Sequence, residues 1–124
     1  IRQFIPPVGK ARWSVLRLQA LSDGLMETVL SLALEINRRP ENERSPQWID
    51  RWCATIRRAV DSLELEVKDF DDALNLGQIA VGCALSYVDL RAADFVFWRE
   101  GCPELAAWHA GFELRSSMQA NRPE

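Results

Sequence analysis

The side chains able to do acid–base or nucleophilic chemistry are few and widely spaced. The sequence has one histidine, His109, and three cysteines, Cys53, Cys83 and Cys102. A nucleophile needs a base beside it, and these positions contain neither an evident Cys–His pair nor a G-x-S-x-G motif. His109 follows Trp108 in an amphipathic segment, which favours a surface or half-buried structural histidine over a catalytic one. The sequence therefore indicates no catalytic residue.

Metal-binding and phosphate-binding patterns are also missing from the sequence. No C-x-x-C pair occurs and a single histidine is present, so a structural zinc site is not expected. The acidic stretch at residues 67–74 lacks the spacing of a calcium loop, and the segment from Gly77 to Gly82 lacks the Gly-Lys-Ser/Thr ending of a phosphate loop. We expect the scattered cysteines to be reduced and buried.

Aromatic side chains are the best candidates for contact with a ligand. Tyr87 lies near the end of a very apolar segment, where its hydroxyl could bond a ligand or a neighbour within the fold. The chain has five tryptophans, which suits an aromatic pocket. Trp48 and Trp52 stand at helical spacing and favour the core instead. Both interpretations stay open.

Composition limits the class of protein. The chain has 124 residues, 48% hydrophobic and 27% charged, which is typical of one globular domain. With 15 Lys and Arg against 18 Asp and Glu, the net charge of −3 argues against binding of nucleic-acid phosphates. No apolar run is long enough to predict a membrane span. Pro6 and Pro7 argue against a signal peptide, and we interpret Ile1 as a cut point within a longer cytoplasmic protein.

Apolar residues recur at spacings of three and four along most of the chain, which predicts an all-α fold. Gly24 interrupts the first predicted helix, and we attribute it to close helix packing. The helices are expected at residues 10 to 37 or 39, 46 to 65 or 66, 76 to 90 and 103 to 115. Residues 1–9 are expected to be an interdomain linker, 41–45 and 67–74 connections, and 116–124 a polar tail.

Residues 76–90 are predicted to form the central helix. The segment is apolar nearly all round, which is typical of a helix buried on every side. Asn75 and Gln78 stand in the reciprocal positions of a capping box, with Leu74 and Ile79 placed for a hydrophobic staple. We therefore expect a bundle of four main helices around a buried central helix.

Four segments together resemble a known family. LNLGQIAVGCALSYVDLRAADFVFW, followed by CPELAAWHAGFELRSSMQA, resembles the C-terminal half of a bacterial glutathione S-transferase. ARWSVLRLQALSDGLMETVL and RSPQWIDRWCATIRRAVDSLE are similar to the two long helices that precede it in that family. The sequence departs from the family in two places. Asn75 and Gln78 replace the usual Ser/Thr-x-x-Asp box, and Arg115-Ser116-Ser117 replaces Arg-Pro-Ser.

The resemblance implies that residues 10–124 are the helical domain of a homodimeric glutathione transferase. A thioredoxin-like domain, absent from this sequence, would bind most of the glutathione and carry the Ser, Tyr or Cys that acts on its sulfur. Glutathione is then a co-substrate rather than a resident cofactor, and the second substrate is a small electrophile. The segment alone is expected to be inactive. The alternative is a non-catalytic interaction or assembly module with the same helical fold.

The resemblance also implies site residues. In several family members an acidic residue from the first helix crosses the dimer interface toward the amino group of the γ-glutamyl end of glutathione, a role that falls to Asp23. Trp13, Leu16 and Arg17, together with Tyr87, are implied to line the electrophile pocket. A solvated or interhelical Asp23, and a Trp13 packed on the linker, remain as alternatives.

Overall fold

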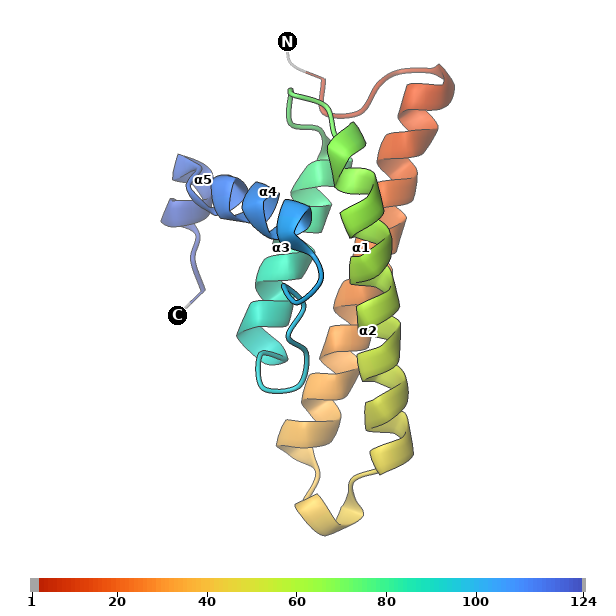
Figure 1. The fold of residues 1–124 in the computed structure, drawn as a ribbon, viewed down its shortest axis with the longest axis vertical. Helices are drawn as coiled ribbons and strands as arrows, with labels where there is room; N and C mark the ends of the chain where they lie inside the picture. Colours follow the sequence, from red (N-terminus) through yellow and green to blue (C-terminus); the bar gives the residue numbers. More distant parts are fainter. Residues whose placement is uncertain (1–2, 124) are drawn as a thin grey trace.

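The computed structural model describes residues 3–123, and every regular element within them is helical (Figure 1). The elements are α1 (Gly9–Arg38), η1 (Glu41–Glu43), α2 (Pro46–Glu66), η2 (Val67–Asp69), α3 (Leu76–Arg91), α4 (Pro103–Glu113) and α5 (Ser116–Ala120), where η marks a short 3-10 helix. The predicted all-α class is confirmed. The proposed cut point at Ile1 lies outside the described residues.

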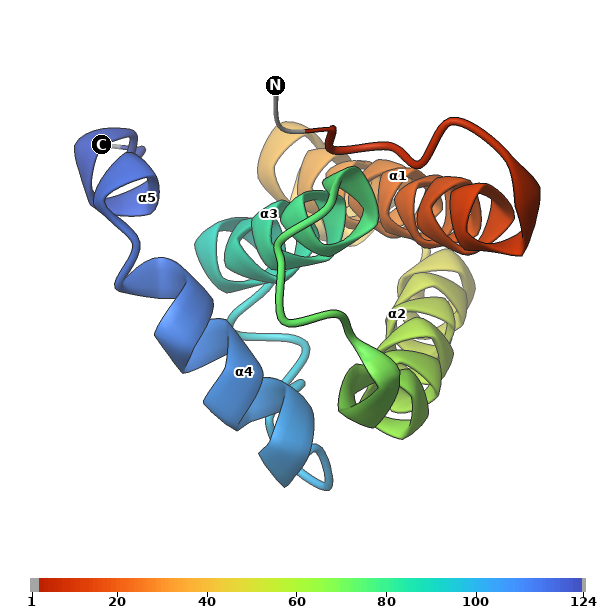
Figure 2. The same ribbon diagram turned by 90° about the horizontal axis from the view of Figure 1, so that it is seen from above.

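The helices form a long hairpin with a second layer packed beside it. Helices α1 and α2 make the hairpin, and α3 packs along α1 in the most extensive helix–helix contact of the fold (Figure 1). Seen from above, α3 lies between α1 and α4, and α5 sits at the outer end of α4 (Figure 2). The core contains residues from all four long helices and from the segment between α3 and α4.

Local capping explains why α2 and α3 begin where the sequence predicts. Ser45 accepts a hydrogen bond from the Trp48 amide at 3.3 Å, and Pro46 follows at the first helical position. Asn75 Oδ1 accepts from the Gln78 amide at 3.0 Å, while Gln78 Oε1 accepts from the Asn75 amide at 3.3 Å. Both hydrogen bonds of a capping box are therefore formed at the start of α3.

The start of α4 is capped by a distant side chain. Cys102, at the N-cap position, provides no side-chain hydrogen bond. Instead the carboxylate of Glu64, on α2, accepts from the Glu104 amide at 3.1 Å and from the Leu105 amide at 2.7 Å. A negative charge at a helix N-terminus is favourable because the free amides there carry partial positive charge. The cap thus attaches α4 to α2.

Arg57 is a second connection between α2 and the segment that precedes α4. The side chain of Arg57 is half-buried. Its guanidinium donates to the Phe97 carbonyl at 3.3 Å and to the Trp98 carbonyl at 3.2 Å, and pairs with Asp61 at 2.7 Å. It also lies 2.9 Å from the sulfur of Cys102. Burial raises the pKa of the Cys102 thiol, and the positive charge of Arg57 opposes that rise.

Helix α3 is enclosed on one face rather than on every side. Its inner face is fully buried and comprises Val81, Ala84, Leu85 and Val88. Its outer face is half-buried and comprises Ile79, Ala80, Cys83 and Tyr87. The expectation of burial all round therefore holds for the inner face alone, and an apolar surface of α3 remains accessible beside α1. Trp48, for which the helical spacing favoured the core over a ligand pocket, is 51% exposed.

Two glycines differ in the space around them. A Cβ on Gly82 would lie 2.3 Å from Cε1 of Phe112, so α3 and α4 cross at a point where no side chain fits. A Cβ on Gly24 would meet no atom within 4 Å, so close helix packing does not explain this residue. Our interpretation of Gly24 is thus wrong, and nothing in the structure requires glycine there.

The C-terminal segment contains a helix where the sequence predicted a polar tail. The backbone of Arg115 is extended, so α4 ends at Glu113 and the short helix α5 begins at Ser116. The side chain of Gln119 donates to the Glu113 carbonyl at 2.6 Å. This hydrogen bond holds α5 against the end of α4.

Candidate ligand groove between α1 and α3

A groove of about 430 Å³ runs between α1 and α3. It is lined by Asp23, Met26, Glu27 and Leu30 of α1 and by Tyr87 of α3. The four α1 residues recur at spacings of three and four, which places them on one side of the helix. Met26, Leu30 and the ring of Tyr87 supply apolar surface, and Asp23 and Glu27 add two carboxylates.

The polar groups of this groove are unengaged within the described chain. Among residues 3–123, the carboxylates of Asp23 and Glu27 have no ion pair or hydrogen bond, and the Tyr87 hydroxyl likewise has no hydrogen-bond partner there. Ligand sites typically combine apolar walls with a few convergent polar groups. The arrangement suits a molecule with an apolar body and a positively charged or hydrogen-bond-donating group.

The structure brings together some of the residues that the sequence analysis selected. Asp23 and Tyr87 line the same groove from two helices. Leu16 is half-buried and lies two turns before Asp23 on the same side of α1. Their roles toward a ligand remain predictions.

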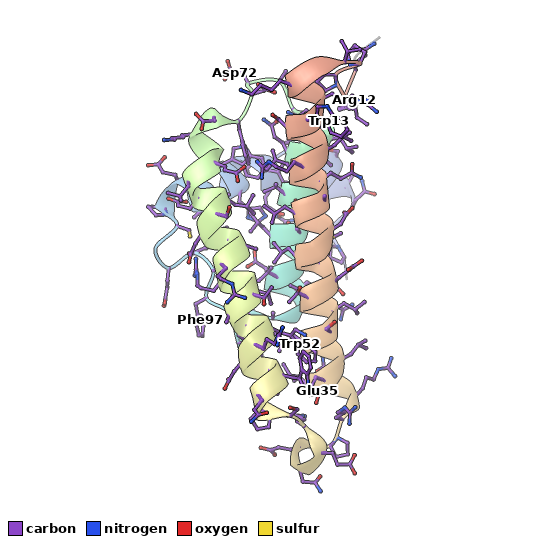
Figure 3. The ribbon with its side chains drawn as sticks, turned by 90° about the vertical axis from the view of Figure 1, so that its right-hand side faces the viewer. Arg12, Trp13, Glu35, Trp52, Asp72 and Phe97 are labelled. Carbon is purple, nitrogen blue, oxygen red and sulfur yellow. The ribbon has the colours of Figure 1, made fainter. Side chains whose placement is uncertain are left out.

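Arg17 and Trp13 lie on another side of α1. The guanidinium of Arg17 forms an ion pair with Glu66 at the end of α2, and Nη1 lies 3.3 Å from Oε1. The hydrogen bond to Glu66 raises the pKa of Arg17. Trp13 is near the start of α1 (Figure 3), and its side chain is mostly exposed, at 71%. The structure therefore does not bring these two side chains into the groove.

A second polar cluster lies between α3 and α4. His109 is 2% exposed, so the prediction of a surface or half-buried position is wrong. Its Nε2 is 3.0 Å from Ser86 Oγ and 3.4 Å from Glu113 Oε1, and the Ser86 hydroxyl also donates to Glu113. Because Ser86 has a single hydrogen to give, its oxygen is free to accept from an Nε2–H of His109.

This cluster does not have the geometry of a catalytic triad. In a triad the serine and the acid use opposite nitrogens of the imidazole. Here Ser86 and Glu113 both lie at Nε2, so Glu113 does not orient His109 for proton transfer from Ser86. Burial lowers the pKa of His109, and the charges of Glu113 and Asp89 oppose that shift. The histidine is therefore a neutral structural group at neutral pH.

Asp89 extends the cluster on α3. It accepts from the Trp98 indole at 2.8 Å and from two nitrogens of Arg99, each at 2.7 Å. Burial acts to raise the pKa of Asp89, but the hydrogen bonds from Arg99 and Trp98 outweigh burial and lower it. The cluster could have been found from helical spacing, because Ser86 and Asp89 are three residues apart and His109 and Glu113 are four apart.

Metal and membrane sites are not indicated by the described chain. Within residues 3–123, no group of three or more His, Cys, Asp or Glu side chains is placed to hold a metal ion. No helix in that range combines the length and apolar character that crossing a bilayer requires.

The chain is similar to solved glutathione transferases along its whole length. A glutathione transferase family member from Pseudomonas fluorescens Pf-5, with bound S-(propanoic acid)-glutathione, matches with a TM-score of 0.95 and 38% identity, covering 100% of this chain and 64% of that one. A structure of a family member from the same strain with bound glutathione matches with a TM-score of 0.94 and 38% identity, covering 100% and 60%. A glutathione S-transferase from Methylobacillus flagellatus KT with bound GSH gives 0.87 and 27%, covering 98% and 61%.

Sequence comparison agrees with these structural matches. The uncharacterised GST-like protein YibF of Escherichia coli K12 is 32% identical over 80 residues, which are 62% of this chain and 39% of YibF. The chain thus spans less than two thirds of the length of these relatives. Residues 46–111, more than half of the chain, match the family described as glutathione S-transferase, C-terminal domain. The chain belongs to the family of glutathione S-transferase C-terminal domains.

Proposed function

We propose that the chain is the helical domain of a dimeric glutathione transferase that conjugates glutathione to small electrophiles. The observation that carries the proposal is the match over the whole chain to a glutathione transferase family member with a bound glutathione derivative. The proposed enzyme includes a thioredoxin-like domain upstream of this chain, as the family resemblance implies, and the relatives are longer than the part that matches.

The proposed reaction is attack by the thiolate of glutathione on an electrophilic carbon. A carbon–sulfur bond forms, and the displaced electron pair leaves with a leaving group or moves onto the acceptor. The upstream domain would hold the thiolate, and the helical domain would hold the acceptor beside it. Correct placement of two reactants supplies a large part of such a rate enhancement. The apolar side chains of Met26, Leu30 and Tyr87 are suited to contact the acceptor.

Asp23 is proposed to contact glutathione rather than the acceptor. Glutathione carries an ammonium group at its γ-glutamyl end, and Asp23 offers a carboxylate with no partner in the described chain. In the proposed dimer this carboxylate would reach a glutathione held by the second subunit. Opposite charges attract strongly within about 4 Å in a partly desolvated cleft. Leu16, two turns earlier on the same side of α1, would extend the apolar surface of the acceptor site, whereas Trp13 and Arg17 would line it only where the upstream domain covers that side of α1.

The test compares Asp23→Ala with Asp50→Ala in the longer protein, with glutathione as the ligand. Asp50 is an exposed acid on α2, outside the groove, and controls for loss of one negative charge. We expect Asp23→Ala to weaken glutathione binding about tenfold, the usual range for a charged hydrogen bond. Its melting temperature should change little. Equal affinities in the two variants would contradict the role of Asp23.

The same preparation tests the proposed activity. Conjugation of glutathione to an aryl halide or an epoxide by the longer protein supports the transferase. A longer protein that binds no glutathione and conjugates neither acceptor would contradict it and favour the assembly module instead.

A further inference from the structure

The segment that enters the domain is attached to the first turns of two helices. The Phe4 carbonyl accepts a hydrogen bond from the Leu76 amide at the start of α3, at 2.9 Å. The Pro6 carbonyl accepts from the guanidinium of Arg12, in the first turn of α1, at 3.3 Å. Figure 2 shows this segment running from the start of α1 back over the start of α3.

The hydrogen bond from Leu76 fills a gap that the capping box leaves. The first amides of a helix have no partner within the helix. Asn75 and Gln78 satisfy each other through the box, but neither side chain accepts from the Leu76 amide. The Phe4 carbonyl does so, which makes the incoming chain part of the α3 N-terminus.

The local sequence favours this docked path. Gly9 has φ +81°, a conformation that other residues rarely adopt, and it allows the chain to turn sharply into α1. Pro6 and Pro7 restrict the backbone before that turn, so less conformational entropy is lost when the segment docks. The start of α3 packs closely on the second and third turns of α1, since a Cβ on Gly77 would lie 2.8 Å from the Val15 carbonyl oxygen and 2.8 Å from Cβ of Leu18.

We propose that residues 4–8 form a strap that fastens the first turn of α1 to the first turn of α3. These two helices line the groove that holds Asp23 and Tyr87. A displacement of the chain at Phe4 therefore changes the capping of α3 and the contact between the two helices. The strap thus connects the segment that enters the domain to the starts of the two helices whose later turns line the groove.

The test removes the hydrogen bond that the Leu76 amide donates to the Phe4 carbonyl. Leu76→Pro deletes the donor, and proline is well tolerated at the first position of a helix. The extended backbone of Asn75, with φ −113° and ψ 172°, is compatible with a following proline. Leu76→Ala is the control, because it shortens the side chain and keeps the amide. Chymotrypsin cleavage after Phe4, followed by mass spectrometry at a temperature well below both melting transitions, reports release of the strap.

We expect cleavage after Phe4 to be about fivefold faster in Leu76→Pro than in Leu76→Ala, the change expected from the loss of one net hydrogen bond when cleavage requires local opening. Equal rates would overturn the proposal. If Leu76→Pro does not fold, the same cleavage measurement is made on Arg12→Ala. Lys10→Ala is its control, because it also removes one positive charge and Lys10 is exposed nearby on α1. Faster cleavage in Arg12→Ala supports the strap, and equal cleavage in that pair overturns it.

Discussion

The environment of His109 in the folded protein changes the pH at which this side chain takes up a proton. It is the single histidine of the sequence, and it is buried between Ser86 and Trp98 with Glu113 beside it. Burial lowers its pKa in the folded protein, while the unfolded chain protonates near the ordinary value of 6.5. The unfolded state therefore binds more protons than the folded state when the pH falls toward 6.

We predict that the free energy of unfolding decreases as the pH is lowered from about 7.5 to 5.5. The decrease begins as the pH approaches 6.5 from above and levels off below the folded pKa of His109. His109→Gln keeps a donor for Ser86 and does not titrate, so its unfolding free energy should vary less with pH over this range. Urea unfolding of both proteins at each pH measures the difference. Parallel pH profiles would show that another group is responsible.

Gly24 and Gly82 should respond in opposite directions to the same substitution. Gly24→Ala places a methyl group in open space on α1 and should stabilise the protein by about 1 kcal/mol, because alanine is the better helix former. Gly82→Ala forces the Phe112 ring to move and should destabilise it by about 1–3 kcal/mol. Denaturant unfolding gives both values. A destabilised Gly24→Ala variant would mean that glycine has a role there that the packing does not show.

At the scale of the helices, the capping box determines where α3 begins. Asn75→Ala removes the acceptor for the Gln78 amide, and Gln78→Ala removes the acceptor for the Asn75 amide. Each substitution should lower the free energy of unfolding by about 1 kcal/mol. Asn37→Ala and Gln47→Ala, at exposed positions on α1 and α2, are the matched controls. Thermal melts in which all four variants resemble the wild type would refute the capping role.

Helix boundaries with a local cause could be predicted from the sequence. Ser45 before Pro46, and the Asn75–Gln78 pair, lie within four residues of the helix starts that they determine. The predicted end of the second helix at residue 65 or 66 agrees with Glu66, and the predicted third helix ends one residue before Arg91.

Features that depend on distant partners could not be predicted. Glu64 and Arg57 act on groups about 40 positions away, and no spacing rule within one helix identifies such partners. Helix α5 was missed because its five residues are too few for a periodic apolar pattern. For the groove, spacing placed Asp23 on a helix but did not show that Tyr87 faces it. Arg17 forms an ion pair with Glu66 at the end of α2, and the sequence pattern did not indicate this pair.

At the scale of the whole molecule, the groove is open along one side. It contains two carboxylates, apolar side chains and the hydroxyl of Tyr87, and no cysteine is among the residues that line it. Cys83, the nearest thiol on α3, has a raised pKa because of burial, which disfavours the thiolate.

We predict that the 124-residue chain, prepared alone, does not conjugate glutathione to an aryl halide above the uncatalysed rate. The reason is that the proposed thiolate-holding domain lies outside this chain. The measurement compares product formation by this chain and by the longer protein at equal concentration. Catalysis by the 124-residue chain alone would require a nucleophile-activating group within it and would contradict the proposed division of roles.

The attachment of α4 to Glu64 has a consequence for the order in which the protein folds. An isolated helix of 11 residues is marginal in water, and α4 has no cap of its own. During synthesis Glu64 leaves the ribosome well before residues 103–113, so its carboxylate stays hydrated until they arrive. Helix α4 then becomes stable in the same step in which it docks on α2. A peptide of residues 103–113 should accordingly be mostly unstructured by circular dichroism, and grafting that segment onto another protein would require transfer of a glutamate from elsewhere in the fold.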